Sequence, residues 1–311
     1  MSQTSRTYSF LLIYIFLNYV SGFIVTAAMG QNGNQMLFSI LWQLVFFIPV
    51  IYIGVKMSGQ KPKEVLSVWK VSPADILLAG TLIIGLMPVL SLLSALMSLF
   101  FPNASADTLG TASQYPLWMS IISLCVIPAV CEELIFRGIV FSGLKNMELK
   151  KACAVGGIIF AVAHFSLQSF LYTFFIGFIF CYIVYRTRSV IPCMVTHFTL
   201  NFTQVMMYKM SAAVEEAVSQ QMQGITMSDI IFEYVSLSLF AIPIIAGIIF
   251  LMGKKYGRPR KLLKNKNIIL IENESVLDYN PQKLYAEKAV NFRFIVIIVI
   301  YFVIVLSQYF V

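Results

Sequence analysis

The chain has 311 residues, of which 59% are hydrophobic and only 12% are charged. Soluble domains carry about 25% charged residues, so this composition excludes an ordinary soluble protein and indicates an integral membrane protein. The net charge of +8 does not indicate nucleic-acid binding, because the sequence has no basic amphipathic face and no nucleic-acid motif. The five cysteines lie in or beside apolar segments without a CxxC pair, which predicts buried thiols rather than a disulfide framework.

Apolar stretches long enough to form membrane helices recur along the chain. A helix needs about 20 mainly apolar residues to cross about 30 Å of hydrocarbon. The sequence therefore predicts an all-α fold, a polytopic transmembrane helix bundle of about nine spans. Eight spans is the alternative, because the fifth and sixth stretches are short and close together. The expected spans are 8–29, 36–55, 75–101, 117–140, 152–165, 169–185, 190–208, 230–252 and 294–311.

The charges between these spans predict the orientation. With a cytoplasmic N-terminus, the cytoplasmic loops contain four, three and two basic residues, followed by a dense basic series at 254–293. The opposite loops contain one basic residue, Lys209, together with Asp107, Glu215, Glu216 and Asp229. This asymmetry is what the positive-inside rule requires. The C-terminus is accordingly expected outside.

Two polar stretches have two interpretations each. The segment 60–69 mixes lysines with apolar residues and Trp69, so it is either an interfacial segment or a solvated loop with one aromatic anchor. The lysine-rich stretch 253–293 either binds anionic lipid or a protein partner, or serves only to fix the orientation.

The fourth expected span contains three charged residues in an otherwise apolar run. Glu132, Glu133 and Arg137 lie between residues 117 and 140. A charged side chain near the centre of a membrane helix costs about 2.5 to 3.5 kcal/mol on insertion scales, so it indicates a functional site. Glu133 and Arg137 are four residues apart and can form an ion pair. Glu132 is rotated by about 100° from Glu133, so it is expected to face a cavity.

The only two histidines of the chain also lie in expected membrane helices. His164 follows Phe160 by four residues, and Asn201 follows His197 by four, so each pair shares a helix face. A rise of 1.5 Å per residue places Glu132, His164 and His197 roughly 12 to 20 Å below the cytoplasmic surface. Three helices thus bring their strongly polar groups to one layer, which predicts a single site.

These residues carry a family resemblance. The motifs Glu132-Glu133-x-x-x-Arg137, Phe160-x-x-x-His164 and His197-x-x-x-Asn201 occur in this order on three expected membrane helices. They resemble the three motifs of the CPBP (Abi) family, intramembrane proteases related to the type II CAAX prenyl endopeptidases. Each motif alone is weak, whereas the ordered trio is specific. The resemblance covers approximately residues 117–210.

The resemblance implies an endopeptidase that cleaves membrane-associated or lipid-modified peptides. It assigns Glu132 as the general base, with His164 holding and polarising the water. His197 and Asn201 are implied to face the scissile carbonyl as an oxyanion hole. Glu133 with Arg137 is implied to be the supporting ion pair, and Phe160 supports His164.

The two possible mechanisms differ in whether they need a metal ion. No cofactor is required when glutamate activates the water, which is the favoured mechanism. Zinc held by Glu132, His164 and His197 is the alternative, with water at the fourth position. The classical H-E-x-x-H helix is absent, and Asn201 is a poor zinc ligand but a good donor to a carbonyl. Cys131 and Cys193 lie near the motifs and are interpreted as packing residues.

The expected regions follow this assignment. They are 1–115, N-terminal membrane helices with an interfacial loop at 56–74; 116–210, the catalytic membrane core; 211–252, an outer loop and the eighth helix; 253–293, a basic cytoplasmic loop; and 294–311, the C-terminal helix.

The expected partners are a membrane-associated peptide or protein substrate and the lipid bilayer, with a membrane sensor or regulator as a further candidate and no nucleic acid. The many Lys, Ile, Asn and Phe residues are typical of an AT-rich bacterial source, which predicts a multi-pass protein of a bacterial plasma membrane. Pheromone or bacteriocin-type peptides are then better candidate substrates than prenylated ones. A non-proteolytic membrane regulator or bacteriocin-immunity protein on the same fold is the alternative function, and a proton-coupled transporter fits less well.

Overall fold

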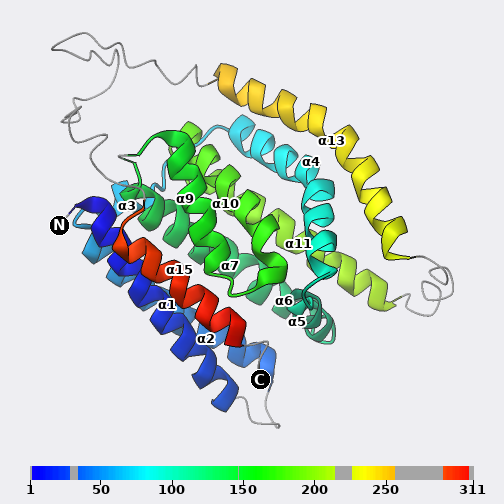
Figure 1. Cartoon of the computed structure of the whole chain (residues 1–311), viewed down its shortest axis with the longest axis horizontal. Coiled ribbons are helices and arrows are strands. Elements are labelled where there is room, and N and C mark those ends of the chain that lie inside the picture. Colours follow the sequence, from blue (N-terminus) through cyan, green and yellow to red (C-terminus); the bar gives the residue numbers. More distant parts are fainter. Residues whose placement is uncertain (1, 29–33, 146, 214–225, 256–289, 308–311) are drawn as a thin grey trace.

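The computed structural model describes residues 2–28, 34–145, 147–213, 226–255 and 290–307. Every regular element in these ranges is helical, and they contain no strand, which confirms the all-α prediction (Figure 1). Residues 214–225 of the expected outer loop and 256–289 of the expected basic loop lie outside the described residues.

Within the described residues, six helices are long and apolar enough to cross a membrane, which indicates a multi-pass membrane protein. Their crossing segments are Gln3–Val25, Gln35–Ser58, Pro73–Ser98, Leu117–Gly143, Leu167–Thr187 and Met227–Lys255. Three further expected spans correspond to α9 (Leu149–Val162), α11 (Ile191–Ala213) and α15 (Phe292–Ser307), which fall short in length or mean hydropathy. The nine-span count and the orientation stay predictions.

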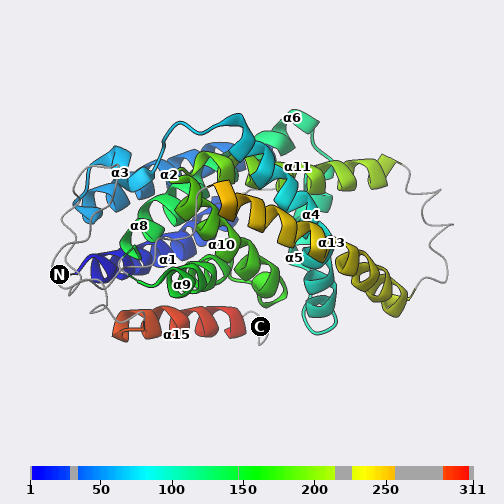
Figure 2. The same cartoon turned by 90° about the horizontal axis from the view of Figure 1, so that it is seen from above.

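The long helices form a bundle with the polar motifs at its centre. On one side α1 (Gln3–Ala28) packs against α2 (Gln35–Ser58) and α15. On the other side α13 (Met227–Lys255) lies along α4 (Pro73–Ser98) (Figure 2). Between these two sides, α10 (Leu167–Thr187) contacts both α9 and α4. The outward face of α13 exposes Phe232, Phe240 and Phe250, as a lipid-facing helix does.

The fourth expected span is one continuous helical run in which two π-helical segments interrupt the α-helix. It consists of α6 (Leu117–Ser120), η1 (Ile121–Val126), α7 (Ile127–Glu133), η2 (Leu134–Val140) and α8 (Phe141–Gly143). The η segments are π-helices, whose hydrogen bonds span five residues instead of four. Such wide turns are rare and occur frequently at functional sites. They border α7 on both sides, and α7 ends with Glu132 and Glu133.

Two short helices occupy stretches expected to be polar loops. The connection expected outside contains α5 (Ala104–Ser113), and the connection expected in the cytoplasm contains α3 (Pro62–Leu66). Val65 of α3 is fully buried, and a Cβ at Gly138 of η2 would lie 3.1 Å from the Cα of Leu66. The segment is therefore a short helix docked on η2 rather than a solvated loop. Lys63 lies over the Trp69 ring, 4.4 Å from its centroid, beside this contact.

A contact between two glycines sets the position of α9. A Cβ at Gly177 of α10 would lie 2.8 Å from the Cα of Gly157, closer than real side chains permit. Small residues let membrane helices approach until their backbones touch. This close approach brings Phe160, one turn after Gly157, against the charged part of η2.

Candidate active site

The charged residues of the first motif form a buried ion pair, as the sequence predicts. The Arg137 Nη1 atom lies 3.0 Å from Oε1 of Glu133, and the two side chains are 1% and 0% exposed. Removing one partner of such a pair leaves an uncompensated buried charge, which is strongly destabilising. The pair therefore couples the end of α7 to η2.

The guanidinium of Arg137 contacts two aromatic rings, but only its Nη1 atom has a hydrogen-bond partner among the described residues. Its Cζ atom lies 4.0 Å from the ring centroid of Phe160 and 4.9 Å from that of Phe180. The Nε and Nη2 atoms of Arg137 and the Oε2 atom of Glu133 are buried without a hydrogen-bond partner. A desolvated cation over an aromatic face gains about 2 kcal/mol or more. The phenylalanine of the second motif thus helps to hold the arginine of the first.

His197 joins this group through the same carboxylate oxygen. Its Nδ1 atom lies 2.8 Å from Oε1 of Glu133, and the residue is buried. A carboxylate that accepts from Nδ1–H fixes the orientation and the tautomer of an imidazole. The three motifs therefore meet in one buried cluster, which we call the ion-pair cluster: Glu133, Arg137, His197, Phe160 and Phe180.

Asn201 lies outside the ion-pair cluster and forms a hydrogen bond with η1. Its Nδ2 atom donates a hydrogen bond of 2.8 Å to the carbonyl oxygen of Leu124, in the π-helix η1. The residue therefore ties α11 to η1 and satisfies a main-chain acceptor there. Its implied role as an oxyanion donor stays a prediction, and one of its two amide protons is already used.

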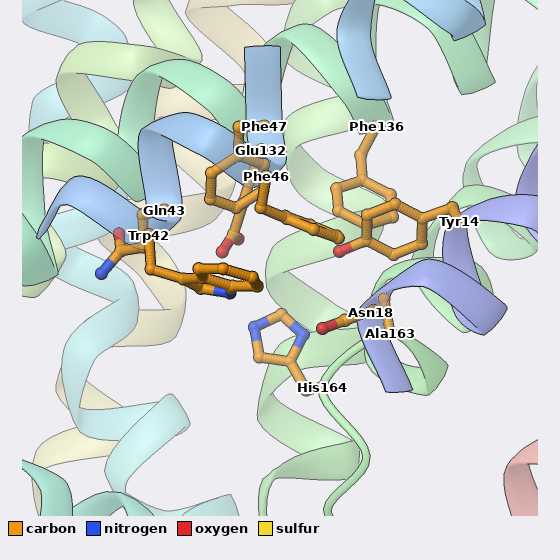
Figure 3. Close-up of a pocket in the computed structure, with 10 residues that line it drawn as sticks. All are labelled: Tyr14, Asn18, Trp42, Gln43, Phe46, Phe47, Glu132, Phe136, Ala163 and His164. Atoms are coloured by element: carbon orange, nitrogen blue, oxygen red, sulfur yellow. The ribbon is translucent and has the colours of Figure 1, made fainter. Parts of the chain in front are cut away.

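Glu132 faces away from the ion-pair cluster and lines a cavity of about 190 Å³. The carboxylate projects into this space, opposite the ring of His164 (Figure 3). Its Oε2 atom is buried and has no hydrogen-bond partner. The rotation predicted between the two adjacent glutamates thus separates them into two environments. We refer to this space as the Glu132–His164 cavity.

His164 lies just beyond the end of its helix. The sequence placed it within a helix at 152–165, but α9 ends at Val162 and a turn follows, with φ +48° at Phe165. The Nδ1 atom of His164 lies 2.7 Å from the carbonyl oxygen of Phe160. A carbonyl only accepts, so Nδ1–H is the donor and Nε2 carries the lone pair. The ring projects into the cavity (Figure 3) with a nitrogen able to accept a proton.

The comparison with known proteins agrees with this geometry. Residues 114–203 match the family model described as Type II CAAX prenyl endopeptidase Rce1-like. This segment is similar to that family. It includes all three motifs, from Glu132 to Asn201, and it spans less than a third of the chain. The resemblance inferred from the motifs is thereby confirmed, and the family is one of proteases. No curated protein matches the chain.

The cavity is completed by helices outside the Rce1-like segment, which sequence reasoning missed. Tyr14 and Asn18 of α1 line it, as do Trp42 and Gln43 of α2. The side chains of Phe46 and Phe47 of α2 form an apolar part of the cavity wall. The polar pair at positions 14 and 18, four residues apart in an apolar helix, was the available signal. This spacing places two polar groups on one face of the helix, but it does not indicate that they share a cavity with Glu132 and His164.

The alternative zinc set of Glu132, His164 and His197 does not assemble among the described residues. Among the described residues, no three His, Cys, Asp or Glu side chains are grouped so as to hold a metal ion. Glu132 and His164 line the cavity, whereas His197 is bound to Glu133 in the ion-pair cluster. Cys131 and Cys193 are free and buried, as expected for packing residues. These donors do not fit a three-ligand zinc site.

Proposed function

We propose that the protein is an intramembrane endopeptidase that hydrolyses peptide bonds of membrane-associated or lipid-modified peptides. The observation that carries the proposal is the pairing in one cavity of an unpartnered carboxylate oxygen of Glu132 with the imidazole of His164. Peptide hydrolysis needs a group that takes a proton from water and another that orients the water. The similarity of residues 114–203 to a protease family supports the same conclusion.

The proposed reaction uses Glu132 as a proton shuttle. A water molecule between Glu132 and His164 gives one proton to the carboxylate while its oxygen attacks the carbonyl carbon of the substrate. The Nε2 lone pair of His164 accepts a hydrogen bond from the same water and orients it. The protonated Glu132 then gives its proton to the amide nitrogen as the C–N bond breaks. The products are a carboxylic acid and an amine, and Glu132 is regenerated.

The ion-pair cluster is proposed to position this machinery. Glu133 is adjacent to Glu132 on α7, and Phe160 lies between Arg137 and His164, with ring centroids 4.6 Å apart in the Phe160–His164 pair. A displacement of Arg137 would therefore move both the carboxylate and the imidazole. Positioning errors of about 1 Å cost about 10²-fold in rate.

The size and lining of the cavity support a short, apolar peptide segment as substrate. Sites for drug-sized ligands usually enclose about 300 to 1,000 Å³, whereas this cavity encloses about 190 Å³. Aromatic side chains from α1, α2 and η2 form much of its wall. We propose that a peptide bond and one flanking side chain enter it, while the rest of the substrate lies in the bilayer of a bacterial plasma membrane.

The test is cleavage by purified protein in vesicles. The wild type and Glu132→Gln are reconstituted with a library of vesicle-tethered peptides, half of them carrying a C-terminal farnesyl group. Mass spectrometry then identifies new termini. Glu148→Gln is the matched control, because Glu148 is exposed and forms only a surface pair with Lys151.

The wild type and Glu148→Gln are expected to produce the same new termini, and Glu132→Gln is expected to produce none. Absence of cleavage by the wild type would contradict the proposal and favour a non-proteolytic regulator. Cleavage confined to the farnesylated half would identify lipid-modified C-termini as the substrate class.

A further inference from the structure

We propose that Tyr14 of α1 is a catalytic residue that donates a hydrogen bond to the oxyanion of the tetrahedral intermediate. The inference rests on the proposed function and adds a residue from outside the segment that matches the protease family, which begins at residue 114. Tyr14 lines the Glu132–His164 cavity, although more than a hundred residues separate it from Glu132 in the chain.

The two residues that the resemblance implies as oxyanion donors each form a hydrogen bond elsewhere. Neither His197 nor Asn201 is among the residues that line it. The Nδ1 atom of His197 is bound to Glu133, and the Asn201 amide donates to Leu124. A hydrolytic site in a low-dielectric environment gains its largest stabilisation from donors aimed at the developing charge. A donor on the cavity wall would therefore add to the stabilisation that His197 and Asn201 are implied to give.

A count of the N–H and O–H donors that line the cavity leaves two residues. Trp42 Nε1 donates to the Ser21 hydroxyl at 2.6 Å. Both protons of Gln43 Nε2 are engaged, by the hydroxyls of Ser39 at 3.1 Å and Ser123 at 2.9 Å. His164 uses Nδ1–H on the Phe160 carbonyl. Among the described residues of the wall, the Tyr14 hydroxyl and the Asn18 amide remain.

Tyr14 is held so that its hydroxyl faces the reaction space. The side chain is 4% exposed, and its ring packs edge-on against Phe136, with centroids 5.5 Å apart. The hydroxyl points into the cavity shared with Glu132 and His164 (Figure 3). Asn18, one turn further along α1, also lines the cavity.

The proton of Tyr14 is not committed to the general base. Oε2 of Glu132 is buried without any hydrogen-bond partner, so the phenol does not donate to it. As water attacks the peptide carbonyl, negative charge develops on the carbonyl oxygen. A neutral O–H positioned there stabilises this charge without giving up its proton.

The test compares Tyr14→Phe with Tyr19→Phe. Both remove one hydroxyl from α1, but Tyr19 is 43% exposed and packs only on Phe23. The substrate is the vesicle-tethered peptide that the wild type cuts fastest. Tyr14→Phe is expected to lower kcat by about 10²–10³-fold, the effect of removing one oxyanion donor. KM should change little, since the interaction forms in the transition state. Tyr19→Phe should match the wild type.

Binding of a phosphinate analogue of the same peptide provides a second readout. Its tetrahedral anionic group resembles the intermediate, so its affinity relative to the substrate should fall with kcat in Tyr14→Phe. A purely structural role of the hydroxyl would change both affinities equally and would overturn the assignment. Activity of Tyr14→Phe equal to that of Tyr19→Phe would overturn it as well. A wild type that cuts no peptide would instead sink the proposed function itself.

Discussion

Two adjacent carboxylates of this protein occupy opposite kinds of environment. Glu133 is fully buried, accepts hydrogen bonds from Arg137 and His197 through one oxygen, and is surrounded by aromatic rings. Glu132 is partly exposed, has an unpartnered oxygen and faces a cavity. The comparison shows how one residue step along a helix separates a carboxylate held in an ion pair from one that we propose to be reactive. Each has one buried oxygen without a hydrogen-bond partner, but the other oxygen of Glu133 is held by Arg137 and His197, whereas Glu132 lines the cavity.

The strongest test of this contrast is to neutralise the residue at the cavity. Glu132→Gln keeps the size of the side chain and removes its ability to take a proton. Turnover of the vesicle-tethered peptide should fall by about 10²–10⁴-fold, the usual contribution of general base catalysis. The resistance of the protein to unfolding in SDS should stay at the wild-type level. A variant that loses stability instead would assign Glu132 to the structural side of the comparison.

The opposite change removes the partner of Glu133. Arg137→Ala leaves the carboxylate buried and unpaired, so the free energy of unfolding should fall by about 3–5 kcal/mol. SDS unfolding and the amount of protein in the membrane measure this. The double variant Glu133→Leu/Arg137→Met replaces both charges with apolar groups and should recover most of the stability. Normal stability with selective loss of turnover in Arg137→Ala would transfer Arg137 to the catalytic set.

A smaller effect distinguishes the two roles of Asn201. Asn201→Ala leaves the Leu124 carbonyl without its side-chain partner, which should lower the free energy of unfolding by about 1–3 kcal/mol. Turnover per folded molecule should decrease much less than in Tyr14→Phe. Unchanged stability together with a kcat loss of 10²–10³ would restore Asn201 as the oxyanion donor.

Metal removal should have the smallest effect. Because Glu132 and His164 are proposed to activate water directly, purified protein should retain its activity after exhaustive chelation. Elemental analysis of the wild type should find less than one equivalent of zinc per chain. Activity that disappears on chelation and returns with added zinc would contradict the proposed mechanism.

The sequence predicted what local spacing determines. The ion pair of Glu133 and Arg137, the contact of Phe160 with His164, and the divergence of Glu132 from Glu133 all follow from helical periodicity. The end of α9 before His164 did not follow, because neither glycine nor proline occurs between Gly157 and Phe165. The turn is visible only in the structure.

Contacts between distant segments could not be predicted. Tyr14 and Gln43 are ordinary residues of apolar helices, and they become part of the candidate site only because α1 packs against η2 and α2 packs against α7 and η2. The bond between His197 and Glu133 joins residues 64 positions apart. The hydrogen bond from Asn201 of α11 to Leu124 of η1 joins distant segments in the same way.

The π-helices on both sides of α7 affect how the run responds to the loss of a residue. Each residue turns an α-helix by about 100°, whereas a π turn contains more residues than an α turn. Loss of one residue from η1 with return to ordinary winding would therefore leave the upstream half of the run in nearly the same orientation relative to Glu132. A homologous chain that is one residue shorter here would keep every motif letter but would lack the wider turn that contains Leu124. Alignments of such chains should be judged by the length of this segment as well as by its identities.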